Sequence, residues 1–326
     1  MSKLLEAMKK RAILKNKRIV LPEGEEIRVI KAAEMITKER IASITLLGDI
    51  DVIKSKCPDV CLDNIRIVNP KTSDKLEEYA TLLYELRKSK GLTSDKAREL
   101  ATDNLYYGTL MLKAGEVDGM VAGSINATSD TLRPALQIIK AAPGIKTVSS
   151  FFLMVMPDDR AFIYSDCGLN PAPDSEQLAD IAITSARTRK DLILDTPRIA
   201  MLSYSTKGSA KHESIDKVIN ATGLVRQRAP GLIIDGELQV DAALVPEVQR
   251  LKAPGSPVEG MANVLIFPDL NSGNIAYKLT QRLGNAIALG PVCQGLDKPV
   301  NDLSRGCTAE DIVFVVVITV LQTREG

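Results

Sequence analysis

The stretch Asp297–Asp311 (DKPVNDLSRGCTAED) brings three side chains with complementary chemistry close together in the sequence. Ser304 offers a hydroxyl group, Arg305 a planar cation with several N–H donors, and Asp311 a carboxylate. An arginine beside a hydroxyl group is typical of a site that binds phosphate or a developing oxyanion. A carboxylate near such a site could serve as a general base.

The residues that follow indicate how this stretch is held. Thr308 and Asp311 have the spacing of a capping box, which predicts a helix that begins near Ala309. Ser304 and Arg305 would then lie on the loop that enters a helix N-terminus, where backbone N–H groups favour anions. The valine-rich run that closes the chain favours a strand by itself, but a buried helix can be apolar all round, so we expect a helix. Many such boxes only cap a helix, and this simpler interpretation stays open.

Composition bounds the kind of protein. The chain has 326 residues, which suggests about two domains. Its 42 basic and 41 acidic residues give a net charge of +1, which argues against nucleic acid or a membrane surface as the main partner. Tryptophan is absent and aromatic residues make up 4%, which argues against a platform for stacking bases.

The cysteines and the single histidine narrow the chemistry further. Five scattered cysteines do not suggest a disulfide framework or a zinc site, so we expect a reducing, cytoplasmic location and no metal. No secretion signal opens the sequence, and the apolar run 312–321 is shorter than the roughly 20 residues that span a bilayer. His212 is the only histidine and is expected at the surface, so general-base work falls to a carboxylate.

Strands and helices alternate along the chain, which predicts βα units and mainly parallel sheets in an α/β fold. Predicted strands lie at 17–21, 41–47, 65–68, 117–121, 147–156, 160–164, 198–203, 231–234 and 263–266, and residues 286–289 form a further apolar run. Predicted helices lie at 3–14, 25–38, 73–90, 94–114, 174–189, 211–228, 271–283 and 309–321. A Pro-Gly break near residue 143 and a hairpin after it divide the chain. We expect a first α/β domain of residues 1–145 plus 297–326, a second of 146–296, and an active cleft between them.

A second polar loop, residues 122–134 (AGSINATSDTLRP), runs from a predicted strand into a predicted helix start. Ser129, Thr131 and Arg133 could present two hydroxyl groups and a guanidinium to an anion. The same residues suit a well-capped helix equally, and both interpretations stay open. Neither of the familiar glycine-rich phosphate-binding motifs occurs in the sequence.

Cations near helix ends and one cysteine form a third group of candidates. Arg87 ends a predicted helix, where the helix dipole alone could explain a cation, although it could also bind a ligand. Lys278 and Arg282 are four residues apart and so share one face of a predicted helix. Cys167 follows a predicted strand and could be a nucleophile, but a buried thiol is the commoner case.

Taken together, several segments resemble the phosphate acetyl/butyryltransferase family. They are NDLSRGC (301–307), STKGSAK (205–211), DGELQVDAALVPEV (235–248), KAPGSPV (252–258), NVLIFPDLNSGNIAYKLTQRLG (263–284) and SDTLRPALQIIK (129–140). The resemblance implies two α/β/α domains with an interdomain cleft, as in the isocitrate/isopropylmalate dehydrogenase type of fold. It also implies a homodimer.

In this family an acetyl group passes between acetyl phosphate and coenzyme A. The resemblance therefore implies acetyl phosphate, phosphate, coenzyme A and acetyl-CoA as substrates, with no bound cofactor. Asp311 would be the general base that takes the proton of the coenzyme A thiol. Ser304 would steady the charged intermediate, and Arg305 would hold the acyl phosphate.

The resemblance also gives roles to residues outside this stretch. Arg87 and Arg133 would bind substrate, and Arg282 would lie on the coenzyme A or phosphate side. Cys307 follows Gly306 as in the family and has no implied covalent role. Together with Ser129, Thr131 and Lys278, these residues are our candidates for substrate binding.

Several alternatives stay open. The expected mechanism is direct attack of the thiol in a ternary complex, and its rival is a ping-pong route through an acetyl-cysteine at Cys167, Cys293 or Cys307. A relative that prefers butyryl or propionyl groups would look similar, because one methylene changes specificity by only ~1–3 kcal/mol. A non-catalytic acyl-CoA sensor is the alternative from another functional class. Metal-dependent hydroxyacid dehydrogenases share the fold type, but the sequence offers no nucleotide fingerprint or acidic metal cluster.

Overall fold

The computed structural model describes residues 2–324, and the predicted first domain's residues 1, 325 and 326 lie outside the described part. The chain forms two compact units. Within the described range, unit 1 comprises residues 2–4 and 143–295, and unit 2 comprises residues 5–142 and 296–324. The domain limits at residues 145 and 296 stay a prediction, while the start of the chain differs from it because residues 2–4 belong to unit 1.

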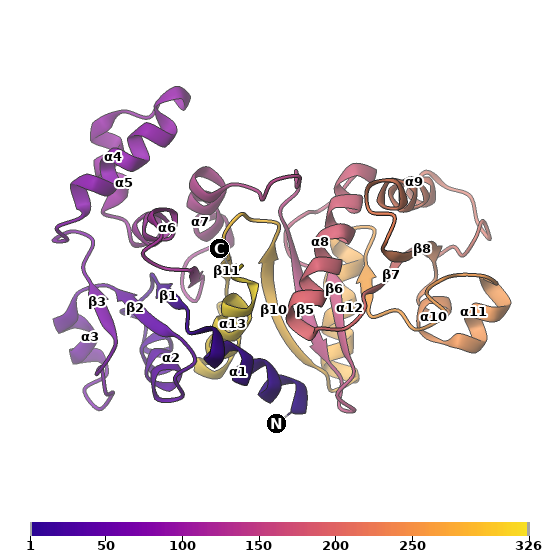
Figure 1. The fold of residues 1–326 in the computed structure, drawn as a ribbon, viewed down its shortest axis with the longest axis horizontal. Coiled ribbons are helices and arrows are strands. Elements are labelled where there is room, and N and C mark those ends of the chain that lie inside the picture. Colours follow the sequence, from indigo (N-terminus) through magenta and orange to yellow (C-terminus); the bar gives the residue numbers. More distant parts are fainter. Residues whose placement is uncertain (1, 325–326) are drawn as a thin grey trace. The chain divides into compact units, whose positions relative to one another are not determined.

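Unit 2 is built on a five-stranded sheet in the order β11-β4-β1-β2-β3 (Figure 1). Every pair of neighbouring strands in it is parallel. Its strands are β1 (Arg18–Leu21), β2 (Ser43–Leu47), β3 (Arg66–Val68), β4 (Gly119–Ala122) and β11 (Val300–Asp302). Strand β4 and most of β1 and β2 are buried, as expected for a parallel sheet covered on both faces.

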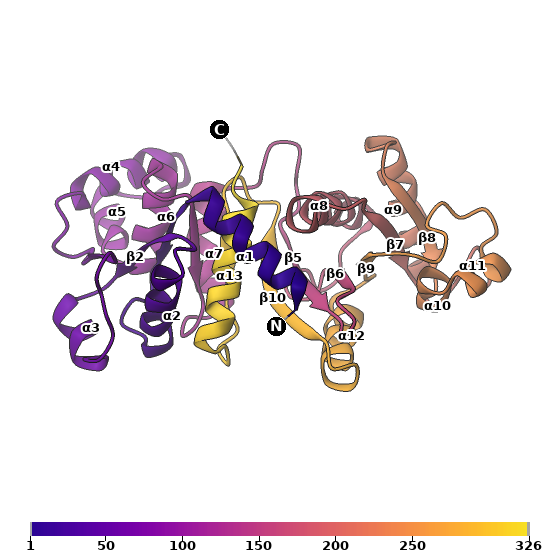
Figure 2. The ribbon, with the colours of Figure 1, turned by 60° about the horizontal axis from the view of Figure 1, so that its bottom comes forward.

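Helices cover both faces of this sheet. Helix α13 packs against α2 and β4, whereas α6 packs against β1 and β4. Figures 1 and 2 show α2 and α13 on one side of the sheet and α4, α5 and α6 on the other. The helical elements are α1 (Lys3–Lys15), α2 (Ile27–Lys38), α3 (Ile50–Lys56), α4 (Leu76–Arg87), the 3-10 turn η1 (Lys88–Lys90), α5 (Ser94–Ala101), α6 (Asn104–Ala114), α7 (Thr128–Pro134), the π-helical turn η2 (Ala135–Ile139) and α13 (Ala309–Gln322).

The prediction of a helix for the closing apolar run is confirmed. Thr308 caps α13 by accepting the N–H of Asp311, and Asp311 accepts the N–H of Thr308 in return. The valines are tolerated because most residues of α13 are buried, so packing rather than intrinsic propensity decides their conformation.

Two predictions for unit 2 are wrong in detail, and one strand was missed. The single helix predicted for 94–114 is two helices, because the side chain of Asp103 accepts the N–H groups of Leu105 and Tyr106 and starts α6 afresh. The predicted helix 73–90 begins only at Leu76 and tightens into a 3-10 turn after Arg87. The polar stretch before α13 contains the short buried strand β11, which its composition did not predict.

Unit 1 contains a six-stranded mixed sheet in the order β10-β5-β6-β9-β7-β8. Its strands are β5 (Ser149–Val155), β6 (Ala161–Ser165), β7 (Arg198–Leu202), β8 (Ile233–Leu238), β9 (Val264–Ile266) and β10 (Ile287–Gln294). The predicted β5–β6 hairpin is confirmed; β10 also runs antiparallel to β5, and the remaining pairs are parallel. Its helices are α8 (Ser175–Ile193), α9 (Glu213–Arg228), α10 (Val240–Leu244), α11 (Pro246–Lys252) and α12 (Leu270–Leu283).

The predicted fold class, α/β with mainly parallel sheets, is confirmed by both units. The likeness to the dehydrogenase type of fold stays a prediction. The prediction of an exposed His212 is also confirmed. Its ring accepts the N–H of Ser214 at the start of α9.

Candidate active site

Three neighbouring strands of unit 2 end side by side at the carboxyl edge of the sheet. Asp302 at the end of β11 lies opposite Ala122 at the end of β4, and β4 in turn pairs with β1. The chain runs from β1 to β2 and β3 on one side and returns to β4 on the other, so the strand order reverses between β1 and β4. Open parallel sheets bind ligands outside their carboxyl edge at such a reversal.

A buried carboxylate closes the loop after β4. Glu23, which follows β1, accepts the backbone N–H groups of four consecutive residues, 123–126, at 2.7–3.2 Å. Burial would raise the pKa of Glu23, but the hydrogen bonds from Ser124 and Asn126 outweigh it, and its pKa lies below the ordinary value. These amides are therefore bonded to a side chain of the protein, and an anion here would have to meet side chains instead.

The side chains after β11 and β4 form a connected chain of hydrogen bonds. Thr128 Oγ1 donates to Asp302 Oδ2 at 2.6 Å and accepts from Arg305 Nη1 and Nη2 at 3.2 and 3.3 Å. Nη1 also donates to the Leu303 carbonyl at 3.1 Å and approaches Asp302 Oδ2 at 3.4 Å. This arrangement joins the two polar loops that the sequence indicated separately.

The hydroxyl of Ser304 lies on an exposed turn. Ser304 Oγ accepts the N–H of Gly306 at 3.3 Å, and its carbonyl accepts the N–H of Cys307 at 3.0 Å. A hydroxyl that accepts one hydrogen bond keeps its own hydrogen for another acceptor. Ser304 is therefore able to donate to a developing negative charge.

Arg28 holds this turn in place, although the sequence analysis did not indicate it. From helix α2, Nη1 donates to the carbonyls of Arg305 and Cys307 at 2.7 and 3.0 Å, and Nη2 donates to the Ser124 carbonyl at 3.0 Å. Nε donates to Glu26 at 2.7 Å. One guanidinium thus ties the loop after β11 to the loop after β4.

Asp311 is half-buried in the first turn of α13. Its Oδ2 accepts the N–H of Thr308 at 2.9 Å, so the carboxylate does serve as a cap. Burial raises the pKa of the nearby Cys307 thiol, and the negative charge of Asp311 raises it further. Asp311 and Cys307 therefore lie within electrostatic reach of each other.

The candidates on α7 have different surroundings. Helix α7 forms, but no side chain caps its N-terminus, so it is not the well-capped helix that the sequence allowed. Ser129 is exposed, whereas Thr131 is buried near Asp302 with a hydroxyl that makes no hydrogen bond of good geometry within residues 2–324. Arg133 pairs with Asp130 at 3.0 Å on the surface.

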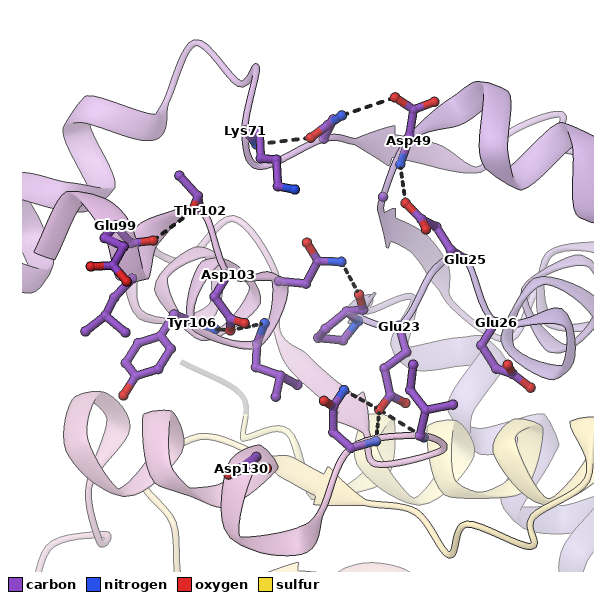
Figure 3. Close-up of a pocket in the computed structure, with 18 of the residues that line it drawn as sticks. Glu23, Glu25, Glu26, Asp49, Lys71, Glu99, Thr102, Asp103, Tyr106 and Asp130 are labelled. Carbon is purple, nitrogen blue, oxygen red and sulfur yellow. Dashed lines mark hydrogen bonds between the residues drawn. The ribbon is translucent and has the colours of Figure 1, made fainter. Parts of the chain in front are cut away.

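Arg133 also lines a pocket of about 1010 Å³ in unit 2. Figure 3 shows Glu23, Lys71, Tyr106 and Asp130 around this pocket. Burial raises the pKa of Tyr106, and the charges of Arg133 and Arg87 oppose the rise. Two arginines predicted from separate motifs thus act on one phenol, and Tyr106 is a pocket residue that the sequence did not indicate.

The remaining candidates belong to unit 1. Lys278 and Arg282 are exposed on α12, with Lys278 Nζ 5.7 Å from the centre of the Tyr277 ring. Cys167 and Cys293 are buried. Burial raises the pKa of Cys167 well above its ordinary value, which disfavours the nucleophilic thiolate.

Among residues 2–324 no helix is long and apolar enough to cross a membrane. The same residues contain no group of three or more His, Cys, Asp or Glu side chains placed to hold a metal ion.

Comparisons with known proteins agree on one family. Residues 3–320 match the family described as phosphate acetyl/butaryl transferase. A phosphate acetyltransferase of Acetivibrio thermocellus is 57% identical over 325 residues, with 98% of each chain covered. One of Thermoanaerobacterium thermosaccharolyticum is 52% identical and covers 98% of this chain and 99% of its own.

Solved structures give the same result. EutD phosphotransacetylase of Staphylococcus aureus has a TM-score of 0.92 at 45% identity, with 98% of each chain covered. A phosphotransacetylase of Streptococcus pyogenes has a TM-score of 0.94 at 43% identity, with 99% of each covered. Together with the loops that meet at the carboxyl edge of unit 2, these matches show that the chain is an enzyme of the phosphate acetyl/butaryl transferase family.

Proposed function

We propose that this chain is a phosphate acetyltransferase that moves an acetyl group reversibly between acetyl phosphate and coenzyme A. The observation that carries this proposal is the joined pair of loops at the carboxyl edge of unit 2, which offers a guanidinium and a hydroxyl to one small anion. The names of full-length relatives at 52–57% identity support the acetyl substrate.

In the proposed reaction the coenzyme A sulfur attacks the acetyl carbon while Asp311 takes the thiol proton. Thiols have a pKa near ~8.5, so little thiolate is present at neutral pH and a base is useful. Asp311 Oδ2 is bonded to the Thr308 N–H, whereas no hydrogen bond to Oδ1 is found within residues 2–324. Oδ1 is therefore available to take a proton, which supports the role of Asp311 as the base.

Arg305 and Ser304 would stabilise the charge that develops as the bond between carbon and phosphate oxygen breaks. Arg305 would hold the phosphoryl oxygens and the departing phosphate. Ser304 would donate to the carbonyl oxygen as it becomes negative, and donors of this kind contribute ~3 kcal/mol. The proton that leaves sulfur goes to Asp311, so inorganic phosphate and acetyl-CoA are the products and no further reactant is needed.

Arg87 and Arg133 would bind the phosphates of coenzyme A. Arg133 lines the pocket of unit 2, and the charges of both arginines reach Tyr106, another residue of its lining. Ser129 and Thr131 would add hydroxyl groups from α7. Lys278 and Arg282 are proposed separately as substrate-binding cations of α12.

The ping-pong route is the less supported alternative. It needs a thiolate, but burial raises the pKa of both Cys167 and Cys307. Mass spectrometry after incubation with acetyl phosphate alone would decide: the ping-pong route predicts an added acetyl group on one cysteine, and the ternary-complex route predicts none.

We also propose a homodimer in the cytoplasm. Ile275, Leu279 and Leu283 lie four residues apart along α12 and are 57, 53 and 79% exposed. An apolar stripe of this kind supports a protein partner, and most soluble oligomers are homo-oligomers. Sedimentation velocity tests it: a dimer is expected, and Leu279→Glu should weaken it.

The test of the function is an assay of coenzyme A-dependent phosphate release with acetyl, propionyl and butyryl phosphate. We expect the highest kcat/KM with acetyl phosphate. A higher kcat/KM with butyryl or propionyl phosphate would mean that this acyl phosphate, and not acetyl phosphate, is the substrate. Binding of acetyl-CoA without any phosphate release would instead favour a sensor.

A further inference from the structure

Asp302 is a buried carboxyl group that the proposed reaction does not use. It is the last residue of β11, and its side chain is 2% exposed. Its Oδ1 has no hydrogen-bond partner in the described part of the chain and faces Gly123, where an added Cβ would lie 2.0 Å from it. The hydrogen bonds that this carboxyl group accepts with good geometry are therefore both made by Oδ2.

Thr128 links this carboxyl group to the surface. A hydroxyl group has one hydrogen, and Thr128 directs it to Asp302 Oδ2 at 2.6 Å. The lone pairs of Oγ1 are then left to accept, and both terminal nitrogens of Arg305 donate to them. Asp302 thereby sets the direction in which the Thr128 hydroxyl can accept a hydrogen bond.

The guanidinium of Arg305 is consequently held along one edge. Nη1 is engaged with Thr128, Asp302 and the Leu303 carbonyl, and one hydrogen of Nη2 points to Thr128. Nε and the second hydrogen of Nη2 have no partner within residues 2–324. These two donors form a parallel fork that matches two oxygens of a phosphoryl group, and the side chain is 42% exposed.

We propose that Asp302 and Thr128 are positioning residues that turn the free edge of Arg305 toward the acyl phosphate. The inference rests on the proposed function, because it takes a phosphoryl group as the ligand of Arg305. It adds two residues to the site, neither of which contacts the reacting atoms.

The alternative is that this hydrogen-bonded chain only fastens two loops together. The two roles predict different responses to removal of the negative charge. Burial raises the pKa of Asp302, so the ionised carboxylate is held in the fold at a free-energy cost. Asp302→Asn should therefore leave the melting temperature unchanged or raise it, while it loosens the hold on Arg305. A purely structural role predicts no selective change in KM for acetyl phosphate.

Thr128 provides the sharpest pair of variants. Thr128→Val keeps the shape and removes the hydroxyl, which should raise KM for acetyl phosphate by about 10- to 100-fold, as expected for a lost hydrogen bond to a charged group. KM for coenzyme A should stay within about twofold of its original value, since that ligand is not held by this edge. Thr128→Ser keeps the hydroxyl and should restore most of the affinity for acetyl phosphate.

Two controls come from the same unit. Asp118→Asn removes a carboxylate paired with Arg18 at the opposite edge of the sheet, and Thr81→Val removes an exposed hydroxyl bonded only within α4. Neither should change KM for acetyl phosphate. A wild-type-like KM in Thr128→Val, or an equal rise in KM for both substrates, would overturn the proposal.

Calorimetric titration with inorganic phosphate separates this inference from the proposed function. If the unsubstituted protein releases no phosphate from acetyl phosphate, the proposed function fails. Weaker phosphate binding in Thr128→Val than in Thr128→Ser would still support the positioning role. Equal phosphate binding in both variants would reject that role, whether or not the protein is active.

Discussion

Two Asp–Arg pairs lie at opposite edges of the unit 2 sheet and differ in how the arginine is used. At the amino edge, Arg18 binds Asp118 side-on, with Nε and Nη2 donating at 3.1 and 2.8 Å. At the carboxyl edge, Arg305 reaches Asp302 with Nη1 alone at 3.4 Å and otherwise through Thr128. The first pair uses its side-on fork within the protein, and the second leaves that fork for a ligand.

The pKa values of the two carboxyl groups differ as well. Burial would raise the pKa of Asp118, but the hydrogen bonds from Arg18 outweigh it and the pKa lies below its ordinary value. Burial does raise the pKa of Asp302, because Thr128 and Arg305 compensate only in part. An ion pair that stabilises the fold and one that prepares a site can thus contain the same two residue types.

The largest effect should come from a carboxylate with a free oxygen. Asp118 and Asp311 each accept a backbone N–H, but both oxygens of Asp118 also accept hydrogen bonds from the Arg18 guanidinium. Asp311→Ala should therefore lower kcat by about 10²- to 10⁴-fold with little change in either KM, as expected for a lost general base. Steady-state kinetics would check this. A wild-type-like kcat would reject the base assignment, and Asp118→Ala serves as the matched control.

Exchanging each arginine for lysine tests the contrast between the two pairs directly. Lysine keeps the charge but cannot offer a planar fork. Arg305→Lys should lower kcat/KM for acetyl phosphate by roughly 10²-fold, in the range of one lost transition-state donor. Arg18→Lys should leave kcat/KM within about twofold, since side chains at this edge make no ligand contacts in the proposed site. Equal losses in both variants would remove the distinction.

Glycine positions give a smaller contrast. A Cβ at Gly123 would lie 2.0 Å from Asp302 Oδ1 and 2.7 Å from the Leu303 nitrogen, and φ there is +103°. Gly123→Ala should therefore lower both thermal stability and kcat/KM for acetyl phosphate, because β11 and its loop must move. Gly115→Ala, with φ +80° and no atom within 4 Å, should cost only about 1–2 kcal/mol of stability and leave the kinetics unchanged. Equal effects would mean that the contact with Asp302 is unimportant.

The smallest predicted effect is a difference of sign in the pH dependence of stability. A lowered pKa gives Asp118 stability that is present above its unfolded-state pKa and is lost as the pH falls through the folded value. A raised pKa means that Asp302 loses stability as the pH rises from its unfolded-state pKa through the folded value. At pH 7, Asp118→Asn should lower the melting temperature by a few degrees, about 2–4 °C per kcal/mol in units of this size, and Asp302→Asn should not.

The cost of Asp302 should disappear as the pH falls from its folded pKa to the ordinary carboxyl value, whereas the contribution of Asp118 should be lost only below the ordinary value, as the pH falls to its folded pKa. Differential scanning calorimetry at several pH values measures them. A lower melting temperature for Asp302→Asn at pH 7 would contradict the burial argument.

Local signals in the sequence predicted much of the fold. The capping box at Thr308 and Asp311 correctly outweighed the strand preference of the valines that follow. The break between α5 and α6 was missed because the amphipathic pattern continues across it, while Asp103 offers a competing cap.

The candidate site was only partly predictable, since it is assembled from distant segments. Ser304, Arg305 and Asp311 stand within one short stretch and were chosen for their chemistry. Glu23 and Arg28 act on loops about 100 or more residues away, and sequence spacing carries no information on such contacts. Asp302 lies inside the chosen stretch but was overlooked, because only its burial distinguishes it from an ordinary loop residue.

The most direct test of the central claim observes the Nε–H groups of the two arginines by ¹H–¹⁵N NMR while inorganic phosphate is added. Arg305→Lys and Arg18→Lys would assign the two signals. We predict that the Arg305 signal shifts saturably with phosphate and that the Arg18 signal stays in place. An Arg305 signal that does not move while phosphate binds elsewhere would contradict the assignment of this edge as the acyl phosphate site.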